Sequence, residues 1–107
     1  MKKLIYFVPK SYLQATKEAI FAAGGGEMGN YRKCSFEILG FGQFLPVQGA
    51  NPHIGNKNEL ERVEEYKVEI LCTNSSLGNS VRALLEAHPY EEVAFEVLDI
   101  LDWTKIK

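Results

Sequence analysis

The spacing of apolar residues changes between two periods along this chain, and the order of the changes limits the folds that it can adopt. A strand alternates apolar and polar residues, whereas an amphipathic helix repeats every 3.6 positions or so. Strand-like patterns alternate with helix-like patterns in the order strand, helix, strand, strand, helix, strand. The strand-like segments are residues 3–8, 34–45, 65–72 and 91–100, and the helix-like segments are residues 11–23 and 77–88.

This order predicts an α+β fold: a ferredoxin-like βαββαβ sandwich, in which two helices cover one face of a four-stranded antiparallel sheet. The 107 residues fit the usual size of one domain, so we expect a single domain over residues 1–107. The other face of the sheet has no helix to cover it, although the strands carry apolar residues on both faces. We therefore expect that face to meet another subunit.

The first predicted helix has clear signals at both ends. Ser11 is expected to cap its N-terminus, and Gly24 to Gly26 are expected to end it, because glycine tolerates positive φ. Phe21 alone lies on the polar side of this helix. Its position indicates either a contact with a neighbouring subunit or a lone exposed aromatic residue.

Two strands contain irregular features. Gly40 and Gly42 soften the second strand and indicate a bend or a bulge there. The alternation of the last strand changes phase near Val97 and Leu98, which indicates a bulge or an interface. The segment 46–63 has no usable period, and loops of that length in a small domain are usually functional or bound to a partner.

The composition excludes several classes of function. A formal net charge of −2 argues against nucleic-acid binding, which needs clustered Lys and Arg. The apolar run before Pro9 is too short for a signal peptide or a membrane span, so we expect a cytoplasmic protein with no membrane partner. Cys34 and Cys72 lack CxxC spacing and are interpreted as buried free thiols. The acidic residues interpreted as solvated surface are Glu59, Glu61, Glu64 and Glu65.

The glycines at residues 24–26 do not have the context of a phosphate-binding loop. Such a loop runs from a strand through glycines to a helix N-terminus, whose partial charge is positive. Here the glycines follow the end of a predicted helix, where the partial charge is negative, and no Gly-Lys-Ser/Thr motif occurs. We therefore interpret these glycines as scaffolding.

The chain has two histidines, His53 and His88, and the sequence allows two interpretations of His88. His88 lies on the apolar stripe of the second predicted helix and is either a packed core residue or a metal ligand. As a ligand it would join Glu91 and Glu92 around a divalent metal ion, with water, His53 or another subunit completing the shell. No histidine lies at an interpretable spacing from Cys34, so we assign no catalytic residue.

Four motifs follow one another along the chain: GNYRKCSFEILGFGQFLP, GANPHIG, VEEYKVEIL and HPYEEVAFEVL. Together they resemble the small domain inserted in the bacterial Nif-three-like proteins of the YqfO type, the NGG-interacting-factor family. That inserted domain is similar in fold to CutA and the PII signalling proteins, which typically assemble as trimers. The resemblance therefore implies a CutA/PII-like fold and a homo-oligomer, with a trimer favoured.

Nif-three-like proteins carry a dinuclear metal site, but the resemblance implies that this site lies in the domains that flank the insertion. A stand-alone inserted domain would be a non-enzymatic regulatory oligomer that binds a small molecule or metal ion between its subunits. The alternative is an accessory domain for a separately encoded dimetal Nif-three-like hydrolase, so whether the chain takes part in catalysis stays open. The residues expected to bind a ligand are Asn30, Tyr31, Asn51, His53 and Tyr90, and the expected metal ligands are His88, Glu91 and Glu92.

Overall fold

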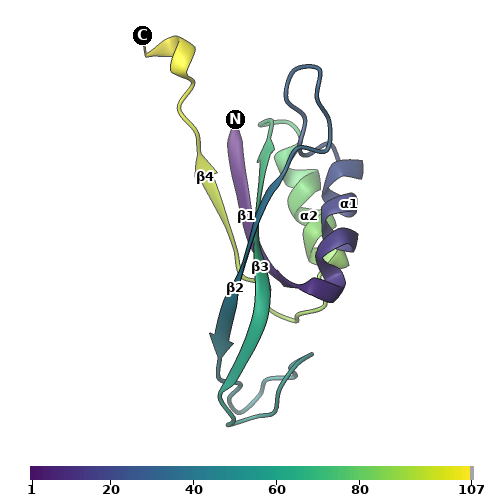
Figure 1. Cartoon of the computed structure of the whole chain (residues 1–107), viewed down its shortest axis with the longest axis vertical. Coiled ribbons are helices and arrows are strands. Elements are labelled where there is room, and N and C mark those ends of the chain that lie inside the picture. The colour runs from purple at the N-terminus through teal and green to yellow at the C-terminus, as the bar shows by residue number, and fades with distance from the viewer. Residues whose placement is uncertain (107) are drawn as a thin grey trace.

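The computed structural model describes residues 1–106 and contains the predicted order of strands and helices (Figure 1). Two short 3-10 helices, η1 (Lys10–Tyr12) and η2 (Trp103–Lys105), accompany these elements. The order confirms the predicted α+β fold. The strands are β1 (Lys2–Pro9), β2 (Phe36–Phe44), β3 (Glu61–Cys72) and β4 (Phe95–Asp99), and the helices are α1 (Leu13–Ala22) and α2 (Leu77–Ala87).

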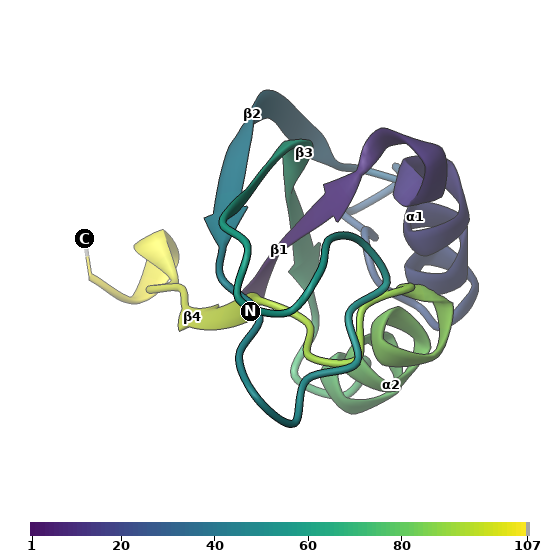
Figure 2. The same ribbon diagram turned by 90° about the horizontal axis from the view of Figure 1, so that it is seen from below.

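The strands form one four-stranded sheet in the order β2-β3-β1-β4, and every neighbouring pair is antiparallel. Both helices lie on the same side of this sheet, as Figure 2 shows. We call the other side, which has no helix, the open face. Because side chains alternate along a strand, the register assigns Leu4, Tyr6 and Val8 to the helix side, and Phe7 with its partner Lys67 to the open face.

The core lies between the sheet and the helices. Alternate residues of the central strands β1 and β3 meet Leu13 and Ile20 of α1 and Leu84 of α2. These side chains are buried, and burial of each large apolar side chain contributes about 2 kcal/mol to stability. The buried strand residues of this cluster are Leu4, Tyr6, Val8, Val68, Ile70 and Cys72.

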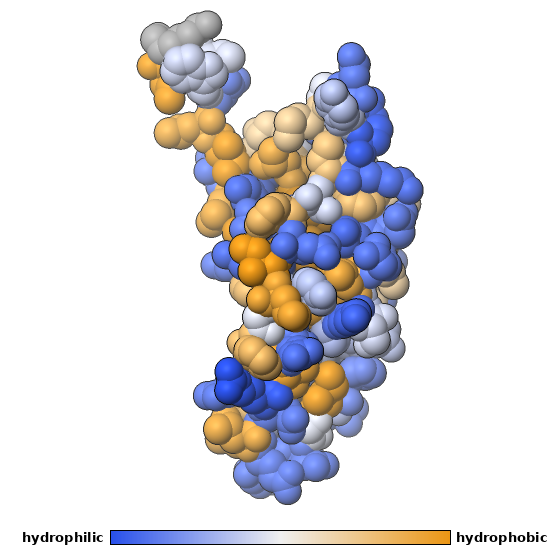
Figure 3. Space-filling view, in the orientation of Figure 1, coloured by the Kyte–Doolittle hydropathy of each residue, from blue (hydrophilic) through white to orange (hydrophobic). Residues whose placement is uncertain are grey.

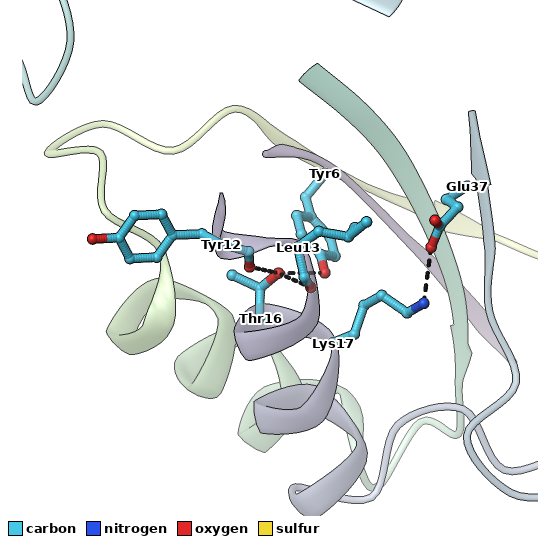
Figure 4. Close-up of polar contacts among 6 residues, drawn as sticks. All are labelled: Tyr6, Tyr12, Leu13, Thr16, Lys17 and Glu37. Carbon is cyan, nitrogen blue, oxygen red and sulfur yellow. Dashed lines mark hydrogen bonds and ion pairs between the residues drawn. The ribbon is translucent and has the colours of Figure 1, made fainter. Parts of the chain in front are cut away.

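A polar contact inside this core joins α1 to the central strand (Figure 4). The Tyr6 hydroxyl lies 2.8 Å from Thr16 Oγ1, and Thr16 Oγ1 donates in turn to the backbone oxygens of Tyr12 and Leu13. Burial raises the pKa of Tyr6 to about 12, although the hydrogen bond to Thr16 acts in the opposite direction. Closer to the edge, Lys17 Nζ pairs with Glu37 Oε1 at 2.8 Å and ties α1 to β2.

The structure contradicts one expectation about the first helix and one of the two alternatives for Phe21. Ser11 does not cap α1: it lies inside η1, and the backbone N–H of Leu13 bonds to the oxygen of Lys10, so the chain enters the helix through a 3-10 turn. Phe21 is not a lone exposed residue, because it packs partly buried against the core, and its contact with a neighbouring subunit stays a prediction. Its ring lies over Gly26, where a Cβ would come within 2.9 Å of it.

The expected bulges are absent from β2 and β4. Pairing between β2 and β3 is continuous from Phe36 with Glu69 to Phe44 with Glu61, and pairing between β1 and β4 is equally regular. The phase change in β4 is therefore not a bulge, and the alternative, an interface at Val97 and Leu98, stays a prediction. This strand lies at the edge of the sheet, and both Val97 and Leu98, on opposite faces, remain exposed.

Two segments extend beyond the body formed by the helices and the central strands (Figure 1). The β2–β3 hairpin passes one end of the helices, and the segment after β4 projects at the other end. This last segment carries exposed apolar side chains at Leu101, Trp103 and Ile106. Within residues 1–106, neither helix has the length and apolar character that a membrane crossing requires.

The Tyr6–Thr16 pair generates a prediction about stability. In Tyr6→Phe, Thr16 Oγ1 keeps its backbone partners, so the loss should be about 1 kcal/mol. In Thr16→Val, which keeps the shape, the buried Tyr6 hydroxyl loses its partner, and the loss should be about 2 kcal/mol. Urea unfolding of both variants measures this difference, and an equal or reversed order would contradict the role of Thr16 as the partner of the buried Tyr6 hydroxyl.

Candidate functional site

The open face contains a groove with a volume of about 710 Å³. Its floor consists of residues of β1, β2 and β3, among them Phe7 and Lys67 of the open face, and its walls are the loop 45–54 and the segment 90–94. Figure 2 shows the loop after β2 running beneath the end of the sheet, beside the segment that joins α2 to β4. The backbone N–H of Asn51 donates to Glu91 Oε1 at 2.8 Å and so links the two walls.

Four aromatic rings surround one end of the groove, with Tyr90 at their centre. The Tyr90 ring lies 4.8 Å from His88, 6.2 Å from Phe44 and 6.3 Å from His53, measured between ring centroids. His53 also packs edge-on against Tyr12, which places the loop against the start of α1. Rings at these separations attract one another. The cluster therefore fixes the loop that forms the groove wall.

A buried carboxylate lies beneath this cluster. Glu65 is only 9% exposed, and its Oε2 accepts a hydrogen bond from the Tyr90 hydroxyl at 3.1 Å. Burial, followed by the charge of Glu65 and this hydrogen bond, raises the pKa of Tyr90 above its ordinary value of 10.0. Tyr90 therefore remains a hydrogen-bond donor at neutral pH.

Gly42 makes room for the Glu65 carboxylate. A Cβ at Gly42 would overlap Glu65 Oε1, whereas a Cβ at Gly40 would meet nothing within 4 Å. The space above Gly42 is therefore occupied by a side chain from the neighbouring strand. This contact explains one glycine of β2 by packing and not by backbone bending.

His88 holds the groove's second wall to the sheet. It is 6% exposed; its Nε2 lies 2.7 Å from the backbone oxygen of Phe7, and its Nδ1 accepts from the backbone N–H of Tyr90 at 3.2 Å. These partners fit a neutral ring with the proton on Nε2. Burial lowers the pKa of His88 below its ordinary value of 6.5; the Phe7 hydrogen bond opposes this shift, and the charge of His53 adds to it.

The structure brings some of the expected site residues together and separates others. Asn51, His53 and Tyr90 lie at the groove with His88, Glu91 and Glu92. Asn30 and Tyr31 lie elsewhere, in an exposed turn where the backbones of Met28 and Tyr31 exchange two hydrogen bonds. The expected ligand-binding set is thus divided between two parts of the molecule.

Two of the three expected metal ligands, His88 and Glu91, already bind backbone groups. Both ring nitrogens of His88 have backbone partners, and Glu91 binds the backbone of Asn51. Within residues 1–106, no three His, Cys, Asp or Glu side chains are grouped closely enough to hold a metal ion. The geometry at His88 thus favours a structural role in which its ring binds the backbone.

The sequence reasoning missed Glu65, the residue with the most unusual environment in the groove. The sequence predicts that Glu65 belongs to a solvated acidic cluster and that Gly42, its contact on β2, marks a possible bulge. Alternation places Glu65 correctly on the polar side of β3, but that side is covered there by Tyr90. The signal in the sequence is the two glycines of β2, of which Gly40 lies opposite Glu65.

The protonation of His88 generates a prediction about pH. The unfolded chain takes up a proton at His88 as pH falls through about 6.5, whereas the folded chain resists protonation because the pKa of His88 is lowered. The free energy of unfolding should therefore fall between pH of about 7 and 5. In His88→Gln this fall should become shallower. His53→Gln is the comparison, and it should change the slope less than His88→Gln does, because the charge of His53 is the smallest of the three influences on the pKa of His88.

Comparisons with known proteins cover nearly the whole chain. No family model matches the chain. The "GTP cyclohydrolase 1 type 2 homolog" of Halalkalibacterium halodurans is 42% identical over 95 residues, which cover 89% of this chain and 26% of that protein. The protein of the same name from Bacillus subtilis is 39% identical over 94% of this chain and 27% of its own length. The chain thus spans about a quarter of the length of the curated relatives that it matches.

Among solved structures, too, the chain matches one part of a longer protein. A Bacillus cereus protein related to NIF3 superposes with a TM-score of 0.82 and 37% identity, over 94% of this chain and 26% of that one. CutA1 from Pyrococcus horikoshii superposes with a TM-score of 0.69 at 12% identity, over 95% of this chain and 85% of that one, and so shares the fold. The chain is therefore a relative of one CutA-like, domain-sized segment of the Nif-three-like proteins.

Proposed function

We propose that this chain is a non-enzymatic binding or regulatory module, which assembles as a homo-oligomer and holds a small ligand in the groove of its open face. The groove itself is the observation that carries the proposal. Its volume of about 710 Å³ is within the range of small-molecule sites, and such sites combine apolar walls with a few convergent polar groups. Here the polar groups are Glu65, Tyr90 and the exposed His53.

The groove favours an organic ligand over a metal ion. Its walls carry apolar and aromatic side chains such as Phe44, Val47 and Ile54, which suit the body of a small molecule. The histidine of the expected metal site uses its ring nitrogens to bind the backbone. We therefore give the organic ligand preference, and the divalent metal ion stays a secondary proposal.

The exposed apolar side chains of the sheet support assembly with other copies of the chain. Figure 3 shows apolar residues gathered over β2 and β4, while the side of the helices is mainly hydrophilic. Exposed apolar residues on two edge strands are unusual for a monomer. The residues concerned are Phe36, Ile38, Leu39 and Phe41 on β2, and Val97 and Leu98 on β4.

Assembly and ligand binding are compatible in one arrangement. β2 is an edge strand and also lines the groove, so a neighbouring copy at this edge would complete the groove wall. The resemblance to CutA and PII proteins favours a trimer. We also propose a cytoplasmic location, in keeping with the free thiols of Cys34 and Cys72.

The activity in the relatives' name cannot be assigned directly to this chain. They are called GTP cyclohydrolase 1 type 2 homologs, but the chain matches about a quarter of their length. That partial match favours a second candidate function, in which the chain is an accessory domain for a Nif-three-like partner with a dimetal site. The two candidates differ in whether the chain needs a second kind of protein.

Oligomeric state tests the first candidate. Size-exclusion chromatography with light scattering at low micromolar concentration should give the mass of an oligomer. Phe36→Asp and Leu98→Asp add charge to exposed apolar positions of the open face and should shift the protein toward monomer. Leu85→Asp, on the exposed side of α2, is the matched control and should leave the mass unchanged. A monomeric wild type would contradict the proposed assembly.

Co-purification tests the second candidate. A tagged chain isolated from its native host should retain no Nif-three-like protein if it acts as a self-contained module. A stoichiometric Nif-three-like partner that survives moderate salt would favour the accessory role. Phe36→Asp distinguishes the surfaces involved, because loss of that partner from this variant would place it on the open face.

A further inference from the structure

We propose that the groove takes an organic cation, a protonated amine or guanidinium attached to an apolar body, and that Glu65 binds the cationic group. This inference rests on the proposed ligand-binding function and names its ligand class. It is carried by a buried carboxylate without a cationic partner, by the acidic lining of the groove, and by the aromatic rings beside that carboxylate.

The environment of Glu65 lacks a positive charge. Burial of a carboxylate is costly unless ion pairs or several hydrogen bonds compensate for it. In the part of the chain that the structure describes, no Lys or Arg forms an ion pair with Glu65. Tyr90 is neutral and donates to Oε2 alone, so Oε1, which is not sealed off from the groove, has no hydrogen-bond donor among residues 1–106. A bound cation would supply what Oε1 lacks.

The rest of the groove would attract a cation too. Its lining includes Glu91 and Glu92 in addition to Glu65, and Lys67 is its one lysine or arginine within residues 1–106. Lys67 faces Glu69 instead, with its Nζ 3.7 Å from that carboxylate. A cleft lined mainly by one sign of charge raises the local concentration of ligands of the opposite sign.

The aromatic rings beside Glu65 are suited to the same ligand. Tyr90 donates to Glu65, and Phe44 and His53 pack around Tyr90. A cation within about 6 Å of an aromatic face gains further attraction. The apolar side chains of Ile38, Val47 and Ile54 would then contact the uncharged body of the ligand.

Gly42 provides a way to move the carboxylate without removing it. In Gly42→Ala the new Cβ would overlap Glu65 Oε1, so the flexible end of Glu65 must shift. Gly40→Ala adds the same methyl group to the same face of β2 and meets nothing within 4 Å. The two variants therefore differ in the position of the carboxylate and share their effect on the strand backbone.

Three probes of one shape separate charge from apolar contact: phenethylamine, phenethyl alcohol and hydrocinnamate, which are cationic, neutral and anionic near neutral pH. Amide chemical shifts measured by nitrogen–proton NMR locate and quantify their binding. Phenethylamine should shift the amides of residues 40–44 and 90–92, and it should bind about tenfold more tightly than phenethyl alcohol. Hydrocinnamate should bind most weakly.

The variants decide whether Glu65 causes this preference. In Glu65→Gln, which keeps the shape, the preference for phenethylamine over phenethyl alcohol should fall below about twofold. Gly42→Ala should also reduce phenethylamine binding, whereas Gly40→Ala should bind like the wild type. The amide spectra report in the same experiment whether each variant is folded.

Several outcomes would overturn the inference. Equal binding of the three probes in the groove would refute the cationic ligand and leave the groove as a ligand site. No shift from any probe would count against the proposed ligand-binding function itself. If Glu65→Gln changes the oligomeric mass in light scattering, a second copy of the chain supplies the cation, and the small-molecule assignment is wrong.

Discussion

The register of β1 with its two neighbours is the constraint on which the rest of the structure depends. Tyr6 pairs with Val68 on one side and Phe95 on the other, which directs it toward the helices. Its neighbour Phe7 pairs with Lys67 and faces the groove. A shift of one residue would exchange the two faces, and the Tyr6 hydroxyl would lose Thr16. One register therefore determines both the core and the composition of the site.

The sequence predicted the elements well because their signals are local. The alternation of residues 65–72 and the apolar stripe of α2 each depend on residues that lie within a few positions of one another along the chain. Phe21 was misjudged because its burial depends on the turn that brings Gly26 beneath its ring. Gly42 was misjudged for a related reason. Its role depends on a side chain of the adjacent strand, which no local pattern includes.

The candidate site was predictable only in part. The motif HPYEE indicated a segment that lines the groove, but not that His88 binds two backbone groups while Tyr90 reaches Glu65. A shared motif identifies positions without giving the atoms that they contact. The separation of Tyr31 from the groove likewise follows from the path of the chain between α1 and β2. Tertiary contacts, and not residue types, decide which polar groups become buried.

The single tryptophan makes the two ends of the molecule optically distinct. Trp103 lies in η2, 67% exposed, in the segment that projects at the end opposite the β2–β3 hairpin (Figure 1). Its emission should therefore respond when a neighbouring copy covers that segment and remain largely insensitive to occupancy of the groove. Tryptophan fluorescence of the unlabelled protein thus reports association independently of ligand binding in the groove.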